Sequence, residues 1–241
     1  MSRQREFKLV GTLGNVIFYN RLGQYCMRIK PTDVRRTEAS VHSGLNFGRA
    51  SRIGKQIRNL VRLVYSPQSD SLVINRLNGA INKFLSWREK MFAAANKMPP
   101  KLPFIYRFQF NSQSDLSTIS AIQPVVTTTN PETTEINFAP SIPVQSLHAP
   151  ANTVSILIKM ILISTNLNDT QTKLLVKSEI EIPFIRETFQ IQPIVSDAPK
   201  QSGDLVILIM SVQYMVNKKG GVEVVKDKKK QPCGIVWASV F

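Results

Sequence analysis

The second part of the chain, from residue 104 to residue 241, is a series of strand-like segments with no helical segment between them. Each segment is rich in β-branched or aromatic residues and is bounded by polar or proline-containing turns. This pattern is typical of antiparallel sandwiches and barrels, and we expect a β-sandwich domain over residues 104–241. The expected strands are Phe104–Phe110, Thr118–Thr128, Glu135–Phe138, Thr153–Thr165, Lys173–Pro183, Thr188–Ile194, Leu205–Val216, Val222–Lys226 and Ile235–Phe241.

One of these segments has no polar face. Residues 205–210 read LVILIM, so both faces of this strand must be buried. We therefore expect it to be a central strand or to lie under another element. The lysine-rich segment Lys226–Lys230, in contrast, is typical of an exposed hairpin tip.

The first hundred residues combine short strands with helices. Strand-like segments around Phe7–Val10, Val16–Tyr19 and Tyr25–Ile29 predict a small three-stranded meander, with a glycine-containing hairpin loop over residues 20–24. Such a sheet is marginal by itself, so it must pack on something.

Two helices are expected next. Over residues 38–65, apolar residues recur at steps of three and four, which predicts an amphipathic helix. Its glycines, Gly48 and Gly54, permit another backbone to approach closely. A second helix is expected from a cap at Ser69 or Asp70 to about Ala95. The fold class is therefore α+β and mostly β, with a basic module of β-hairpin and αα-hairpin at 1–100 and the β-sandwich at 104–241.

The net charge of the chain is high and unevenly distributed. The formal charge is +15, with a pI of about 10.1. Residues 1–100 hold 18 Lys+Arg and 5 Asp+Glu, a net +13. An excess of this size favours nucleic acid, an anionic membrane surface or an acidic protein as partner.

Five of these cations are evenly spaced along the first predicted helix, opposite its apolar side. The solvated face of an ordinary helix also carries acids, as i,i+4 pairs, but residues 39–69 contain none. Arg is more common than Lys in residues 1–100, and its guanidinium matches phosphate geometry. The candidate polyanion-binding residues are Arg21, Arg28, Lys30, Arg35, Arg36, Arg49, Arg52, Lys55, Arg58 and Arg62.

No pattern in the sequence indicates catalysis. The two histidines, His42 and His148, and the two cysteines, Cys26 and Cys233, lack the spacing of a metal site, and we expect no metal and no cofactor. No nucleophile elbow or phosphate-binding loop is present. We therefore expect a protein that is not an enzyme, and whether the two cysteines pair is left open.

The ends and the apolar runs bear on localisation. The N-terminal residues lack the apolar core of a secretory signal, and no apolar run is long enough to span a bilayer. The sequence thus predicts a soluble cytoplasmic protein without a transmembrane segment.

Two stretches carry a resemblance to a known group of proteins. GTLGNVIFYNRLGQYCMRIKP and the later FGRASRIGKQIR are similar to the N-terminus of an uncharacterised protein family from Bacteroidota. Gly11, Gly14, Asn15, Phe18 and Tyr19 match its opening motif. The helix motif is matched by Phe47, Gly48, Ala50, Gly54, Lys55, Ile57 and Arg58. The resemblance covers about 60 residues and implies a recurring hairpin and helix, but no activity.

Three functions are compatible with these features. The first is a non-catalytic protein whose basic module contacts DNA or RNA phosphates without reading base sequence. The alternative is a self-assembling homo-oligomeric subunit of a shell, tube or filament, favoured by the apolar strand LVILIM, the strand-like C-terminus and the helix glycines. A weaker alternative is a peripheral protein that binds an acidic partner or an anionic membrane surface.

Overall fold

The structure, a computed structural model, describes residues 2–3, 9–31, 37–65, 70, 72–94, 99, 101–129 and 132–241. The chain forms two compact units, Met1–Ser43 and Gly44–Phe241. The helices therefore belong almost wholly to the same unit as the large sheets. This division differs from the predicted one, which grouped the helices with the N-terminal strands.

The first unit contains a four-stranded antiparallel sheet in the order β1-β4-β3-β2. Its strands are β1 (Ser2–Arg3), β2 (Gly11–Leu13), β3 (Val16–Arg21) and β4 (Gln24–Ile29). The β3–β4 hairpin is tighter than predicted, because its strands pair as far as Arg21 and Gln24. Leu22 and Gly23 both have positive φ, 51° and 81°. Two successive positive φ values are the geometry that suits a two-residue hairpin turn.

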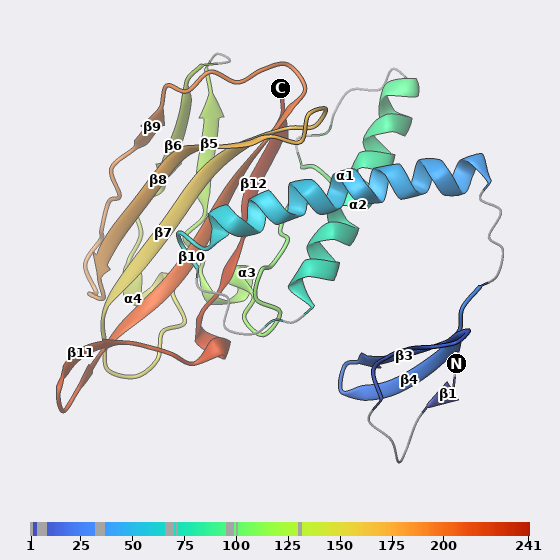
Figure 1. The fold of residues 1–241 in the computed structure, drawn as a ribbon. Helices are drawn as coiled ribbons and strands as arrows, with labels where there is room; N and C mark the ends of the chain where they lie inside the picture. Colours follow the sequence, from blue (N-terminus) through green and yellow to red (C-terminus); the bar gives the residue numbers. More distant parts are fainter. Residues whose placement is uncertain are drawn as a thin grey trace. The chain divides into compact units, whose positions relative to one another are not determined.

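The predicted αα-hairpin is present in the second unit. Helix α1 (Glu38–Val61) and helix α2 (Val73–Ala93) cross each other (Figure 1). Ser69 lies outside the described residues, and Asp70 accepts a hydrogen bond from the Leu72 N–H at 3.0 Å just before α2. The apolar sides of both helices are buried, so their amphipathic pattern is explained by packing against the rest of this unit.

The main sheet of the second unit has five antiparallel strands. Strand β10 (Asp204–Lys218) pairs on one side with β7 (Thr153–Asn166), which in turn pairs with β8 (Thr172–Pro183). On its other side β10 pairs with β12 (Cys233–Val240) and then with β11 (Gly221–Val224). The segment LVILIM is thus the centre of the central strand, as predicted.

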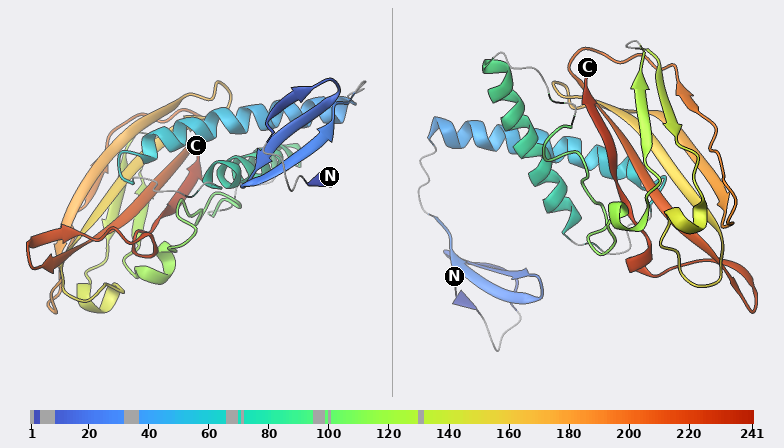
Figure 2. Two further views of the ribbon diagram at one scale, coloured as in Figure 1. Left: turned by 60° about the horizontal axis from the view of Figure 1, so that its bottom comes forward. Right: turned by 180° about the vertical axis from the view of Figure 1, so that it is seen from behind.

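A second sheet lies over the other face of the main sheet (Figure 2). It has three antiparallel strands, β5 (Pro124–Thr128), β6 (Thr134–Phe138) and β9 (Ile194–Ser196). Two short helices, α3 (Leu116–Ile119) and α4 (Pro143–Ser146), lie in its connections.

The two faces of β10 are buried in different cores. Leu205, Ile207 and Ile209 pack in the core that includes α1 and α2, whereas Val206, Leu208 and Met210 pack in the core that includes β6. The predicted class, α+β with mostly β structure, is confirmed, and the two facing sheets form a sandwich-like body. Sequence patterning did not predict that the helices would cover its outer face.

Three predicted strand boundaries are wrong. Phe104–Phe110 is a series of turns, because Phe104 and Arg107 have positive φ values of 67° and 64° that a strand does not allow. The segment Thr118–Thr128 is helical at first and becomes a strand only at Pro124. In Thr188–Ile194 the strand begins only at the last residue, since β9 starts at Ile194.

Candidate polyanion-binding surface

Helix α1 carries four of the predicted cations, Arg62 follows its last residue, and packing separates the five into two groups. Ala50, Ile53 and Ile57 are completely or almost completely buried against the sheet and α2. At about 100° per residue, the basic residues lie away from this apolar arc. The neighbours of each cation decide whether it is available to a partner.

Arg49 is bound within the chain. One of its guanidinium nitrogens, Nη2, donates to the carbonyl of Leu167 at 2.8 Å, and Nη1 lies 3.8 Å from Oε1 of Glu89 on α2. The other carboxylate oxygen of Glu89 accepts from the Asn46 side chain at 3.3 Å. Arg49 therefore holds α1 against the β7–β8 turn and α2, and its charge is partly compensated.

Arg58 also has an internal role. Its Nη1 donates to Oδ1 of the buried Asn78 at 3.0 Å, where α1 and α2 cross. Asn78 in turn donates to Oγ of Ser51 at 3.4 Å. Partial burial, and secondarily the charge of Arg62, lower the pKa of the Arg58 guanidinium. It remains a cation, but much of its hydrogen-bonding capacity is used at the helix crossing.

Gly54 makes this crossing possible. A Cβ atom at this position would lie 2.3 Å from Oδ1 of Asn78 and 3.1 Å from Nη1 of Arg58, so a side chain fits only if Asn78 moves. The close neighbours at Gly54 are therefore side chains, not the backbone that we expected. At Gly48 the prediction is wrong, because a Cβ atom there would meet no atom within 4 Å among the described residues.

The remaining three cations, two on α1 and Arg62 just after it, are exposed. Arg52, Lys55 and Arg62 have no hydrogen bond or ion pair within the described part of the chain. With ~100° per residue they fall within about 80° of helix circumference. We call them the exposed basic stripe of α1, a set of cations that an anion can reach.

The other predicted residues lie in the first unit or outside the described residues. Arg21, Arg28 and Lys30 are exposed, and the Arg28 guanidinium lies 6.0 Å from the centre of the Tyr19 ring. Arg21 and Arg28 point to the same face of the N-terminal sheet. Arg28 pairs with Ile17, and Ile17 and Arg21 are four residues apart on β3, so their side chains lie on one side of the strand. Arg35 and Arg36 lie outside the described residues.

A second lysine cluster was missed as a candidate, although its sequence signal, NKKGG followed by KDKKK, is plain. Lys218 ends β10, Lys219 lies in the turn that follows, and the turn Lys228–Lys230 precedes β12. The predicted hairpin tip at Lys226–Lys230 is instead a short 3-10 turn, in which the Asp227 side chain accepts from the Lys229 N–H. Asn111 anchors this turn by donating to the carbonyl oxygens of Lys228 and Gln231, both at 2.8 Å.

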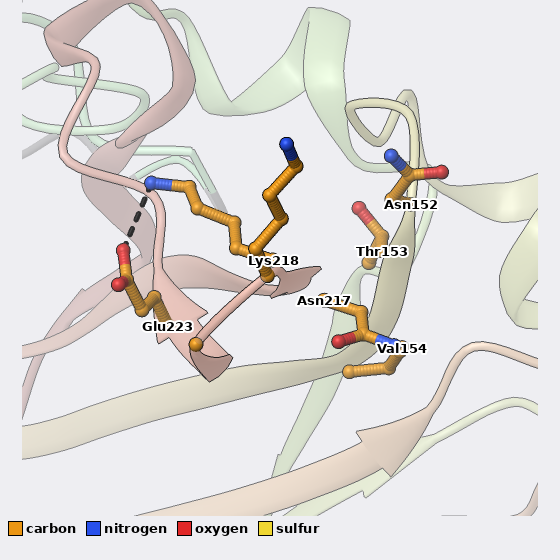
Figure 3. A pocket seen from close by; sticks show the side chains of 8 residues that line it. Asn152, Thr153, Val154, Asn217, Lys218 and Glu223 are labelled. Carbon is orange, nitrogen blue, oxygen red and sulfur yellow. Dashed lines mark hydrogen bonds and ion pairs between the residues drawn. The ribbon is translucent and has the colours of Figure 1, made fainter.

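An open groove of about 960 Å³ lies beside Lys218 and Lys219 at the turn of the β10–β11 hairpin (Figure 3). Polar side chains of Asn152, Thr153 and Asn217 line it, together with Lys218 and Glu223. Lys218 is paired with Glu223 at 2.9 Å, so the charge there is largely compensated. No aromatic side chain lines the groove, and we base no function on it.

Neither cysteine has the environment of a reactive thiol. Cys26 and Cys233 are both free and both buried. Burial raises the pKa of the Cys233 thiol above its usual range, so it is not a thiolate at neutral pH. Within the described ranges, no group of three or more His, Cys, Asp or Glu residues is placed to hold a metal ion. None of the described helices is both long and apolar enough to cross a membrane.

Comparison with known proteins adds no functional assignment. No family model matches the chain. A search of curated proteins likewise found no match. The surface chemistry above is therefore the basis for any functional conclusion.

Proposed function

We propose that this is a non-catalytic binding protein of the cytoplasm whose basic surface contacts the phosphate backbone of DNA or RNA without reading base sequence. The observation that carries this proposal is the exposed basic stripe of α1, Arg52, Lys55 and Arg62. These cations have no partner in the described chain, and no acid lies between residues 39 and 69 to neutralise them.

The geometry of the stripe suits a linear polyanion. Lys55 and Arg62 are seven residues apart, which is about 10 Å along a helix axis. A DNA strand presents one phosphate per ~3.4 Å of axis, so a helix lying along the backbone meets several phosphates. Contacts of this kind fix position but carry no sequence information.

The internal roles of Arg49 and Arg58 refine the proposal. Both are committed to hydrogen bonds that hold α1 in place. We therefore assign the contact with phosphate in the second unit to Arg52, Lys55 and Arg62. In the first unit, Arg21, Arg28 and Lys30 remain the proposed contacts.

The test is a salt series of binding to a fluorescently labelled duplex, followed by anisotropy. For B-DNA the slope of log K against log salt is about −0.9 per neutralised phosphate. The triple variant Arg52→Gln/Lys55→Gln/Arg62→Gln should therefore reduce the slope by up to about 3. Two duplexes of unrelated sequence should bind with the same affinity.

A matched control removes the same amount of charge elsewhere. Lys83, Lys173 and Arg186 are exposed cations outside the stripe, and their triple replacement by Gln should leave the slope near that of the wild type. Absence of binding at ~50 mM salt would refute the proposal. Equal weakening by both triple variants would show that only net charge matters.

Three sequence features favoured the alternative of a self-assembling subunit, and contacts within the chain now explain them. LVILIM is buried between two layers of its own unit, and the C-terminal strand β12 pairs with β10. Gly54 packs against Asn78 of the same chain. These features no longer require a neighbouring copy to explain them, so nucleic-acid contact is the function that we favour.

A further inference from the structure

The N-terminal sheet has one face made of apolar side chains. Residues that pair across neighbouring strands point to the same face, so the registers Leu13↔Val16 and Val16↔Ile29 place three aliphatic side chains in one row. The pair Phe18↔Met27 lies two positions along the same strands and therefore shares this face. We call these five residues the apolar face.

The opposite face carries the charges. The registers Ile17↔Arg28 and Arg21↔Gln24 place both arginines there, together with Tyr19. The paired positions of the apolar face thus include no cation, whereas the opposite side carries both arginines together with Ile17 and the buried Cys26. We call the side with Arg21 and Arg28 the basic face.

Much of the apolar face is left open by the described residues of its unit. Leu13 and Ile29 are each 73% exposed, and Met27 is 38% exposed. A unit of residues 1–43 is close to the size below which disulfides, metals or oligomerisation are usually needed for stability. Its one cysteine is free. An exposed apolar patch on such a unit indicates an interaction site.

We propose that the apolar face binds the same face of a second copy of the chain. Packing two apolar faces together leaves Arg21 and Arg28 of each copy on the outside, away from the contact. An anionic membrane would instead favour cations on the same side as the apolar residues. A nucleic acid would favour the basic face.

The edges of the sheet support packing through faces. One outer strand, β2, has only three residues, which is too short to offer an edge to another strand. Two sheet faces pack at ~10 Å separation to form a sandwich. Five apolar residues give a contact below the ~800 Å² per partner of typical stable complexes, so we expect a dimer with a micromolar dissociation constant.

The test is sedimentation equilibrium of the full chain, free of nucleic acid, from about 1 to 200 µM, a range chosen to bracket that affinity. The wild type should shift from its monomer mass of 27.1 kDa towards twice that value. Leu13→Lys/Ile29→Lys should abolish the shift. Leu13→Thr/Ile29→Thr keeps strand-favouring residues, so the sheet is retained, and should raise the dissociation constant at least tenfold.

The matched control is Arg21→Thr/Arg28→Thr, which changes two residues of the same strands on the basic face and should dimerise like the wild type. A wild type that stays monomeric to 200 µM overturns the proposal, and so does a Thr variant at Leu13 and Ile29 that dimerises normally. A monomer that binds phosphatidylserine vesicles through this face assigns it to lipid instead. Binding of DNA does not depend on any of these outcomes, so the two proposals fail separately.

Discussion

The crossing of α1 and α2 leaves no room for a side chain at Gly54, and the substitution Gly54→Ala tests this directly. The new Cβ atom would lie 2.3 Å from Oδ1 of Asn78, which is closer than real Cβ contacts allow. Asn78 is buried and short, so it can escape only by turning away from Arg58. The substitution therefore breaks one of the hydrogen bonds that join the two helices.

Two opposing effects determine the size of the change. Alanine is favoured over glycine in a helix interior by about 1 kcal/mol, which stabilises the variant. A buried hydrogen bond to a charged group contributes ~1.5–3 kcal/mol, and overpacking costs a further ~1–3 kcal/mol where the neighbours cannot relax. Where the neighbours cannot relax, the balance is a loss of about 1.5–5 kcal/mol in the free energy of unfolding of the second unit.

Urea unfolding followed by tryptophan fluorescence measures this loss, because Trp87 and Trp237 both lie in the second unit. The control is Gly48→Ala on the same helix, where a Cβ atom meets nothing. It should stabilise the protein by up to about 1 kcal/mol. If Gly54→Ala is as stabilising as Gly48→Ala, the close crossing is refuted.

A double-mutant cycle isolates the contact. In an Asn78→Ala background the atom that obstructs the new Cβ is gone, so Gly54→Ala should change sign and become neutral or stabilising. The coupling between the two positions should be about 1–3 kcal/mol. Additive effects would mean that Asn78 is not the neighbour that excludes a side chain.

Two further predictions concern single buried groups of the second unit. Tyr214 is fully buried, and this burial raises its pKa to about 12. Its hydroxyl has no hydrogen-bond partner in the described chain. Tyr214→Phe should therefore increase the free energy of unfolding, measured in urea, by about 1 kcal/mol. Burial acts to raise the Asp70 pKa, but hydrogen bonds from Arg76 and the Leu72 N–H outweigh it and lower the pKa. A carboxyl group whose pKa is lower in the folded state stabilises the fold at pH values above its unfolded-state pKa. This stabilisation is lost as the pH falls through the folded-state pKa. The urea concentration at the unfolding midpoint should therefore fall less steeply below about pH 4 in Asp70→Asn than in the wild type. The same dependence of the midpoint on pH in both proteins would contradict this prediction.

Hydrophobic patterning predicted how many faces of a strand or helix are buried. LVILIM required two covered faces, and the amphipathic helix around Ile53 and Ile57 required one. Patterning could not predict that the apolar side of the helices covers one face of LVILIM, because the sequence does not say which apolar faces meet. The helices were therefore assigned to the N-terminal strands rather than to the sheet they cover.

The segment Phe104–Phe110 shows a different limit. Its aromatic residues have strand propensity, yet Phe110 is buried in the core formed with the helices, and the positive φ of Phe104 and Arg107 turns the chain there. Arg76 contributes to this bend by donating to the carbonyl of Gln109 at 2.9 Å and lying 5.3 Å from the Phe108 ring centre. These contacts between distant segments override local propensity.

The candidate site was predictable as a helix face but not as a set of available charges. The absence of acids indicated that the α1 cations are not paired locally along the helix. It could not reveal Glu89 and the Leu167 carbonyl beside Arg49, or Asn78 beside Arg58, because these partners are remote in sequence. Only tertiary contacts distinguish a cation that braces the fold from one that can bind a partner.

The division into units also changes how the charge should act. Residues 1–43 hold 8 Lys+Arg and 3 Asp+Glu, a net +5, which leaves +10 on residues 44–241. The excess is therefore shared between two connected bodies, each with its own exposed cations. If one polyanion engages both, the covalent connection raises the effective concentration of the second contact. The slope of log K against log salt would then approach the value for six neutralised phosphates. Three would be contacted by Arg21, Arg28 and Lys30 and three by the stripe of α1, whereas either set alone gives the slope for three.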